Sequence, residues 1–152
     1  MKVVVAPNSF KGSLSASEAA SAIARGVRQA FPDAEIVEVP VADGGEGTVE
    51  ALVSAHRGSY RTAEVEGPLG EPVAAPYGLI KAGRTGVVEL ASASGLTLIA
   101  PERRDPRKTS TYGFGQLLDE VRSTGVGQII AGIGGSATND GGAGMAQALG
   151  YR

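Results

Sequence analysis

The chain carries the apolar run Val3-Val4-Val5-Ala6 and then, after a loop, the sequence Ser15-Ala16-Ser17-Glu18. A short, unbroken apolar run is typical of a strand covered on both faces of a parallel sheet. The second sequence is a capping box, in which the Ser and Glu side chains satisfy the first free amides of a helix. The next strand is predicted at Glu35-Ile36-Val37-Glu38-Val39. Residues 2–39 are therefore predicted to form a strand-helix-strand unit with a right-handed crossover, the repeating unit of a parallel α/β sheet.

The pattern of the sequence changes near residue 60. Residues 48–55 are predicted to form a helix, but between residues 60 and 84 apolar and polar residues alternate around Gly67-Pro68-Leu69-Gly70, which favours antiparallel hairpins. Strands are also predicted at residues 87–91 and 128–131, and helices at residues 111–123 and from residue 145. We expect an α/β fold with a boundary near residue 60. Residues 1–60 would begin a Rossmann-like or flavodoxin-like, three-layer domain with a parallel sheet, and residues 61–152 a second, mixed α/β domain.

Composition and charge exclude several classes of function. The 152 residues carry 14 Lys and Arg against 16 Asp and Glu, a formal net charge of −2, which gives no basic field for nucleic acid. The apolar runs are far shorter than the roughly 20 residues that a membrane-spanning helix needs. Cysteine is absent, so thiol catalysis and cysteine-ligated metals are excluded. The apolar stretch after Met1-Lys2 is too short for a signal peptide. We therefore expect a cytoplasmic protein without nucleic-acid or membrane partners.

Glycine, at 23 residues, is concentrated in two loops that repeat each other. The first glycine loop is Asp43-Gly44-Gly45-Glu46-Gly47, and the second, residues 132–144, ends in Asp140-Gly141-Gly142-Ala143-Gly144. Over the ten residues that start at each Asp, six positions are identical, and each loop is predicted to link a strand to a helix. Glycines let the backbone approach a ligand, and a helix N-terminus adds positive potential, so this pattern favours phosphate. A single Asp-Gly is more often an ordinary turn with a capping carboxylate, but two copies favour the binding interpretation.

Established nucleotide motifs fit this sequence poorly. The sequence Gly-x-x-x-x-Gly-Lys-Ser/Thr of the standard P-loop is absent. The loose dinucleotide pattern Gly-x-Gly-x-x-Ala is matched by residues 132–137, which is a weak signal. Lys11 lies at the carboxyl end of the first predicted strand, where it could meet an anion, although an ordinary solvated lysine fits that position equally well. His56, the single histidine, is predicted to be a solvated residue at a helix end.

Five blocks of sequence carry a more specific signal. They are Ala6-Pro7-Asn8-Ser9-Phe10-Lys11-Gly12-Ser13-Leu14, Pro40-Val41-Ala42-Asp43-Gly44-Gly45-Glu46-Gly47-Thr48, Glu89-Leu90-Ala91-Ser92-Ala93-Ser94-Gly95-Leu96, Thr109-Ser110-Thr111-Tyr112-Gly113 and residues 132–145. In this order they resemble the bacterial, ATP-dependent glycerate kinase family, type 1. The resemblance implies a chain more than twice this length, with the first domain completed beyond residue 152, so these residues would be an N-terminal portion whose own activity stays open. The family usually has Asp at the position of Asn8, and an amide there can neither balance the charge of a metal nor act as a base.

The resemblance implies transfer of the γ-phosphoryl group of MgATP to a hydroxyl of glycerate, in which the protein aligns the reactants and neutralises charge. The predicted catalytic residues are Asp43, Asp140 and Lys11, and the predicted Mg²⁺ ligands are Asp43, Glu46 and Asp140. The predicted ATP-binding residues are Gly44, Gly45, Gly47, Gly134, Gly135, Ser136, Thr138, Asn139, Gly141 and Gly142, with Ser9 as a further hydrogen-bond donor. The alternative is a non-catalytic module that binds a small anion or a nucleotide. Self-association as a homo-oligomer is a further expectation, because a truncated domain exposes apolar surface.

Overall fold

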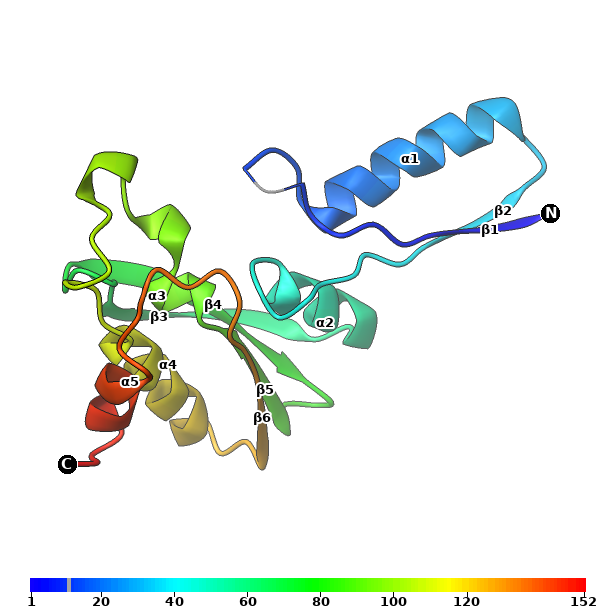
Figure 1. The fold of residues 1–152 in the computed structure, drawn as a ribbon. Helices are drawn as coiled ribbons and strands as arrows, with labels where there is room; N and C mark the ends of the chain where they lie inside the picture. Colours follow the sequence, from blue (N-terminus) through cyan, green and yellow to red (C-terminus); the bar gives the residue numbers. More distant parts are fainter. Residues whose placement is uncertain (11) are drawn as a thin grey trace. The chain divides into compact units, whose positions relative to one another are not determined.

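The computed structural model describes residues 1–10 and 12–152 of the chain. The predicted site residue Lys11 lies outside the described residues. Packing divides the chain into two compact units, Met1–Asp43 and Gly44–Arg152, whose elements are labelled in Figure 1. Among the described residues, no helix combines the length and the apolar character needed to cross a membrane.

The first unit is the predicted strand-helix-strand. Strand β1 (Lys2–Val5) pairs in parallel with β2 (Glu35–Glu38), and helix α1 (Ala16–Ala30) connects them. The capping box forms as the sequence predicts: the Glu18 amide donates to Ser15 Oγ at 3.2 Å, and the Ser15 amide donates to Glu18 Oε2 at 2.8 Å. The helix buries a face made of alanines, namely Ala16, Ala19, Ala20 and Ala24. Small side chains on this face allow α1 to lie close to the strands.

The second unit is built on a mixed sheet in the order β3-β4-β5-β6. Strands β3 (Ser59–Glu66), β4 (Pro72–Ile80) and β5 (Thr85–Glu89) are antiparallel neighbours, whereas β6 (Gln128–Gly132) runs parallel to β5. The hairpins expected between residues 60 and 84 are therefore confirmed. The helices are α2 (Thr48–His56), α3 (Ala91–Ser94), α4 (Tyr112–Ser123) and α5 (Ala143–Ala148), with 3-10 turns η1 (Leu96–Leu98) and η2 (Pro101–Arg103). The α/β fold class predicted from the sequence is confirmed by the parallel and mixed sheets.

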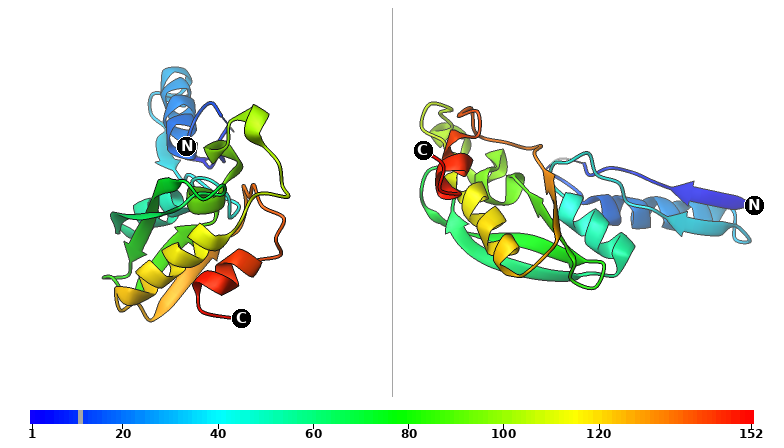
Figure 2. Two further views of the ribbon diagram at one scale, coloured as in Figure 1. Left: turned by 90° about the vertical axis from the view of Figure 1, so that its left-hand side faces the viewer. Right: turned by 90° about the horizontal axis from the view of Figure 1, so that it is seen from below.

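Helices cover both faces of the second unit's sheet, as Figures 1 and 2 show. On one face, Phe114, Leu117 and Val121 of α4 pack with Val88 and Tyr77 of the sheet. On the other face, residues of α2 pack with Ile80 and Val87. Val87 and Val88 are consecutive residues of β5 and serve opposite faces, as the alternation of a strand requires. Helix α5 lies beside α4 on the α4 face.

The division between the two units falls after Asp43, earlier than the boundary expected near residue 60. Helix α2 explains the difference, because its buried residues Val49 and Val53 pack against Ile80 and Val87 of the second sheet. The change in sequence pattern marks where the hairpins begin. The packing of the preceding helix, which the pattern does not reveal, places the first glycine loop from Gly44 onward in the second unit.

Candidate functional site

The two glycine loops meet at the carboxyl ends of β5 and β6. The two strands run parallel and pair Glu89 with Gly132, so both end at the same edge of the sheet, where open α/β sheets bind ligands. The Gly134 amide donates to the Gly44 carbonyl oxygen at 2.8 Å. A Cβ added to Gly132 would lie 2.5 Å from the same oxygen, so only glycine permits this approach. The structure therefore brings residues 44–46 of the first loop against residues 132–135 of the second.

The carboxylate of Glu89, at the end of β5, caps the N-terminus of α2. The N-cap residue Gly47 has φ +88° and supplies no side-chain hydrogen bond. Instead, Glu89 accepts hydrogen bonds from the Val49 amide at 3.0 Å and the Gly47 amide at 3.4 Å. Burial raises the pKa of Glu89, and the hydrogen bonds from Val49, Gly47, Thr48 and Ser92 offset only part of this effect. The Gly47 amide, predicted to contact phosphate, thus already has a partner within the chain.

Asp140 holds the second glycine loop in a similar way. Its Oδ2 accepts from the Thr111 amide at 2.8 Å and the Gly144 amide at 3.2 Å, and its Oδ1 accepts from the Gly142 amide at 3.0 Å. The Thr111 hydroxyl also donates to it, at 2.8 Å from Oδ2. Burial alone would raise the pKa of Asp140, but the hydrogen bonds from Thr111, Gly142 and Gly144 outweigh burial and hold the pKa below its usual value. These donors fix the carboxylate at the start of α5.

The segment between Gly134 and Asp140 presents polar groups of a different kind. The hydroxyl oxygens of Ser136 and Thr138 lie 2.7 Å apart, and the Thr138 amide donates to Ser136 Oγ at 3.0 Å. The Gly135, Ser136 and Asn139 amides donate no hydrogen bond to any described residue. Ser136 and Asn139 are also exposed. Three amides, and the one hydroxyl of the Ser136–Thr138 pair that does not donate to the other, are therefore available to an anion in this segment.

Glu46 lies beside that segment. Its Oε1 accepts a hydrogen bond from the Thr97 hydroxyl at 3.0 Å, and a Cβ added to Gly135 would lie 3.8 Å from the same oxygen. A half-exposed carboxylate of this kind suits Mg²⁺ that arrives with a nucleotide, because Mg²⁺ keeps its waters and needs only one or two protein carboxylates. Within the described part of the chain, no group of three or more His, Cys, Asp or Glu residues forms a cluster for a metal ion. Glu46 thus fits Mg²⁺ as a single protein ligand.

Two further predicted site residues, Asp43 and Ser9, belong to the first unit. Asp43 is its last residue and is exposed. Asn8 is also exposed, and its Oδ1 accepts a hydrogen bond from the Ser9 amide at 2.7 Å. His56, in the second unit, ends α2 and is exposed. The predicted role of Lys11 concerns a residue outside the described part of the chain.

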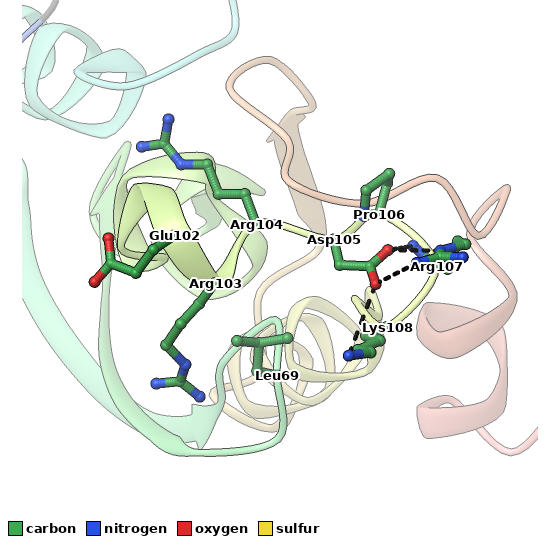
Figure 3. A pocket seen from close by; sticks show the side chains of 8 residues that line it. All are labelled: Leu69, Glu102, Arg103, Arg104, Asp105, Pro106, Arg107 and Lys108. Carbon is green, nitrogen blue, oxygen red and sulfur yellow. Dashed lines mark hydrogen bonds and ion pairs between the residues drawn. The ribbon is translucent and has the colours of Figure 1, made fainter.

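The second unit also has a charged groove (Figure 3). It encloses about 770 Å³ and is lined by Leu69 and residues 102–108. Three of its four cations form ion pairs within the protein: Asp105 accepts from Arg107 at 2.9 Å and lies 3.8 Å from Lys108, and Arg103 contacts Glu71 at 2.7 Å. The fourth, Arg104, donates to the Ile99 carbonyl oxygen at 3.1 Å. These contacts satisfy the charges of the groove within the chain, and nothing in the lining assigns a ligand to it.

Sequence reasoning did not single out Glu89 or Thr97 as functional residues. Glu89 carried a signal, because a charged residue inside the apolar strand Val87-Val88-Glu89-Leu90-Ala91 needs a buried partner. Thr97 carried none, since its partner Glu46 is distant in the sequence. Thr111 belongs to one of the five blocks that carry the family resemblance, but its contact with Asp140 joins residues that are distant in the sequence. Only the folded chain shows that these hydroxyls fix the acidic residues of both glycine loops.

The fold and the site together define a class of protein: an α/β protein in which two glycine loops close against each other at the ends of neighbouring parallel strands. The sequence model of the glycerate kinase family matches residues 3–152 of this chain. The chain therefore belongs to the glycerate kinase family, and the resemblance noted in the five sequence blocks is confirmed.

Individual relatives agree with this assignment. The chain is 58% identical over 152 residues to glycerate 2-kinase of Escherichia coli (strain K12) and 55% identical over 152 residues to glycerate kinase of Bacillus subtilis (strain 168). A crystal structure of a candidate glycerate kinase 2 from Salmonella typhimurium LT2 shares 55% sequence identity, with a TM-score of 0.80, and the match covers 99% of this chain. The chain spans 40% of the length of each of these three proteins.

Proposed function

We propose that this chain supplies the phosphate-binding part of a glycerate kinase, which transfers the γ-phosphoryl group of ATP to a hydroxyl of glycerate. Family membership supports the reaction class, and one observation in the structure carries the role of this chain. That observation is the contact between the two glycine loops, in which the Gly134 amide donates to the Gly44 carbonyl oxygen at 2.8 Å. It gathers two glycine-rich segments at one sheet edge, where backbone amides can surround a polyphosphate.

The reaction needs little covalent work from the protein. The glycerate hydroxyl oxygen forms a bond to the γ-phosphorus, the bond from that phosphorus to the bridging oxygen breaks, and ADP leaves with the bonding electrons. The hydroxyl proton passes to a base. The protein lowers the barrier by aligning the two oxygens and by neutralising charge on the transferred group.

The available donors decide which predicted residues contact the phosphates directly. The Gly135, Ser136 and Asn139 amides and the Ser136 and Thr138 hydroxyls are proposed to do so, together with the Gly44 amide, while Gly45 lines the same site. The Gly47 and Gly142 amides donate to Glu89 and Asp140, so they act by shaping the loops. Gly134 and Gly141 are proposed to act in the same way, the former through its contact with Gly44.

The acidic residues take separate roles in this proposal. Glu46 would hold Mg²⁺ as its single ligand from these residues, and Mg²⁺ when bound neutralises phosphate charge. Asp43 is proposed as the acceptor of the glycerate hydroxyl proton. Asp140 was also predicted as a base and a metal ligand, but the four donors on its carboxylate favour an indirect contribution through the loop. Lys11 is proposed to offset the charge of the phosphates or of the glycerate carboxylate.

The variant Gly134→Ala tests the loop contact in the full-length protein. An added Cβ would lie 2.8 Å from the Gly45 nitrogen and Cα, so the loops must separate. We expect kcat/KM for glycerate phosphorylation to fall about 100-fold, the usual effect of misplacing reactive groups by about 1 Å. Gly26→Ala in α1, where an added Cβ meets nothing within 4 Å, is the matched control and should retain full activity. Equal activity of the two variants would remove the loop contact from the mechanism.

Calorimetric measurement of ligand binding distinguishes a kinase from the alternative, a non-catalytic binding module. A kinase should bind ATP more tightly with Mg²⁺ present and should bind glycerate as well, whereas a simple anion module should respond to neither. A cytoplasmic location and self-association accompany the proposal as expectations. Fractionation of cells and measurement of the mass in solution test them separately.

A further inference from the structure

Glu89 joins three elements of the second unit through a buried carboxylate. The residue ends β5 and is only 8% exposed. Its Oε2 accepts from the Val49 amide of α2 at 3.0 Å, and its Oε1 accepts from the Gly47 amide at 3.4 Å and from Ser92 Oγ of α3 at 3.5 Å. Gly47 and Val49 stand forty or more residues earlier in the sequence, so this contact exists only in the folded chain.

These contacts replace the cap that α2 lacks. Most helices are capped by a Ser, Thr, Asp or Asn at the N-cap, but Gly47 has φ +88° and no side chain. A carboxylate at this position also meets the positive end of the helix, where an anion is favoured. Glu89 therefore supplies from β5 the acceptor oxygens that an N-cap side chain would otherwise provide to α2.

At the second glycine loop, a carboxylate likewise accepts hydrogen bonds from amides at a helix start, but this carboxylate belongs to the loop. Asp140 belongs to the loop itself and accepts from the Gly142 and Gly144 amides at the start of α5, whose N-cap Gly142 likewise has positive φ, +82°. Both helix starts are thus occupied by carboxylates of the chain. The first loop differs in that its anchor is a strand residue beneath it, which ties residues 44–47 to the sheet edge where Gly44 meets Gly134.

We propose that Glu89 is a positioning residue, which holds the first glycine loop in the shape that receives the phosphates of ATP. This inference rests on the proposed function of the loops as a phosphate site. Glu89 does not touch the phosphates; it acts through the Gly47 and Val49 amides. Glu46 lies directly before Gly47, so without this anchor the Thr97 hydroxyl, which donates to Glu46 Oε1 at 3.0 Å, is the contact that keeps Glu46 beside Gly135.

The test compares Glu89→Gln with Glu50→Gln in the full-length protein. Gln at residue 89 keeps the size of the side chain but replaces one acceptor oxygen by an NH₂ group. Two donors would then face each other, and one hydrogen bond to a backbone amide would be lost. Glu50 lies one residue beyond Val49 in the first turn of α2 and controls for loss of a charge near the helix start. Amide hydrogen exchange at Gly47 and Val49 and the steady-state constants for MgATP and glycerate are measured for both variants.

We expect exchange at Gly47 and Val49 to be about tenfold faster in Glu89→Gln, with KM for MgATP raised about tenfold and KM for glycerate changed less than twofold. A tenfold change corresponds to the loss of one hydrogen bond to a charged group. Unchanged exchange would overturn the inference. Faster exchange with a lower kcat but an unchanged KM for MgATP would also overturn it, because Glu89 would then support the fold without shaping the site that binds MgATP. If the unaltered protein transfers no phosphoryl group to glycerate, the proposed function fails, and exchange together with the affinity for MgATP still decides the role of Glu89.

Discussion

Two carboxylates in equivalent places have pKa values displaced in opposite directions. Burial raises the pKa of Glu89. Burial acts in the same sense on Asp140, but the hydrogen bonds from Thr111, Gly142 and Gly144 prevail and lower its pKa. The difference arises because Asp140 is only half-buried and has more donors at short distance. Asp140 therefore stabilises the second loop as an anion. For Glu89, burial disfavours the ionised form of the side chain.

The variant Asp140→Asn should lower the free energy of unfolding at pH 7 by about 2 kcal/mol, because its NH₂ group faces amide donors. Since the pKa of Asp140 is lowered in the folded state, its contribution is present above the unfolded pKa of about 3.9 and is lost as the pH falls through the folded value. The difference between the two proteins should therefore shrink below about pH 4. Urea unfolding at pH 7, 5 and 3 measures it.

The control for this prediction is Asp119→Asn. Asp119 is on the exposed side of α4, where it pairs with Arg122, and a surface pair of this kind contributes less than about 1 kcal/mol. A loss at Asp140 no larger than the loss at Asp119, or one that grows on acidification, would contradict the role assigned to Asp140 here.

The sequence indicates where the second loop lies, because its glycines and its Asp140 are recognisable from neighbouring residues alone, whereas the contact of this loop with phosphate stays a prediction. Gly134 and Ser136 were singled out from the sequence, and the structure places both in the segment that meets the first loop or presents free donors. Glu89 could not be assigned in the same way. Its role depends on which amides lie above the end of β5, and that is decided by the packing of α2.

At the scale of elements, glycines in α4 bring layers together. The sequence predicts that Gly113 and Gly115 weaken this helix, and the structure shows what they allow. A Cβ on Gly113 would overlap the Glu66 carbonyl oxygen of β3, and a Cβ on Gly115 would lie 2.5 Å from the Met145 carbonyl oxygen of α5. Close approach of α4 to β3 and α5 thus requires residues without a side chain, and it places Thr111 where it reaches Asp140.

The variant Gly113→Ala should therefore destabilise the protein by at least about 3 kcal/mol, because backbone atoms of β3 cannot yield as a flexible side chain could. Gly26→Ala, in the exposed middle of α1 where an added Cβ meets nothing within 4 Å, should instead stabilise the protein by about 0.5 to 1 kcal/mol. Urea unfolding compares the two. A stable Gly113→Ala protein would show that α4 packs less closely than described.

At the scale of the whole molecule, the local signals predicted elements better than they predicted units. The capping box at Ser15 and the alternation in the hairpins depend on neighbouring residues, so they can be recognised in the sequence. The division after Asp43 depends on Val49 and Val53 packing across the chain against Ile80 and Val87, which no local pattern reports. The chain spans 40% of the length of the two curated relatives named above.

The central claim is that the two glycine loops form one site for the phosphates of ATP. The most direct measurement follows the backbone amide resonances of the full-length protein during titration with MgATP. We predict that the largest shifts occur at Gly135, Ser136 and Asn139, with smaller shifts at Gly44 and Gly45. Binding of MgATP that leaves these five amides unshifted, with the changes located in another part of the chain such as residues 102–108, would contradict the claim.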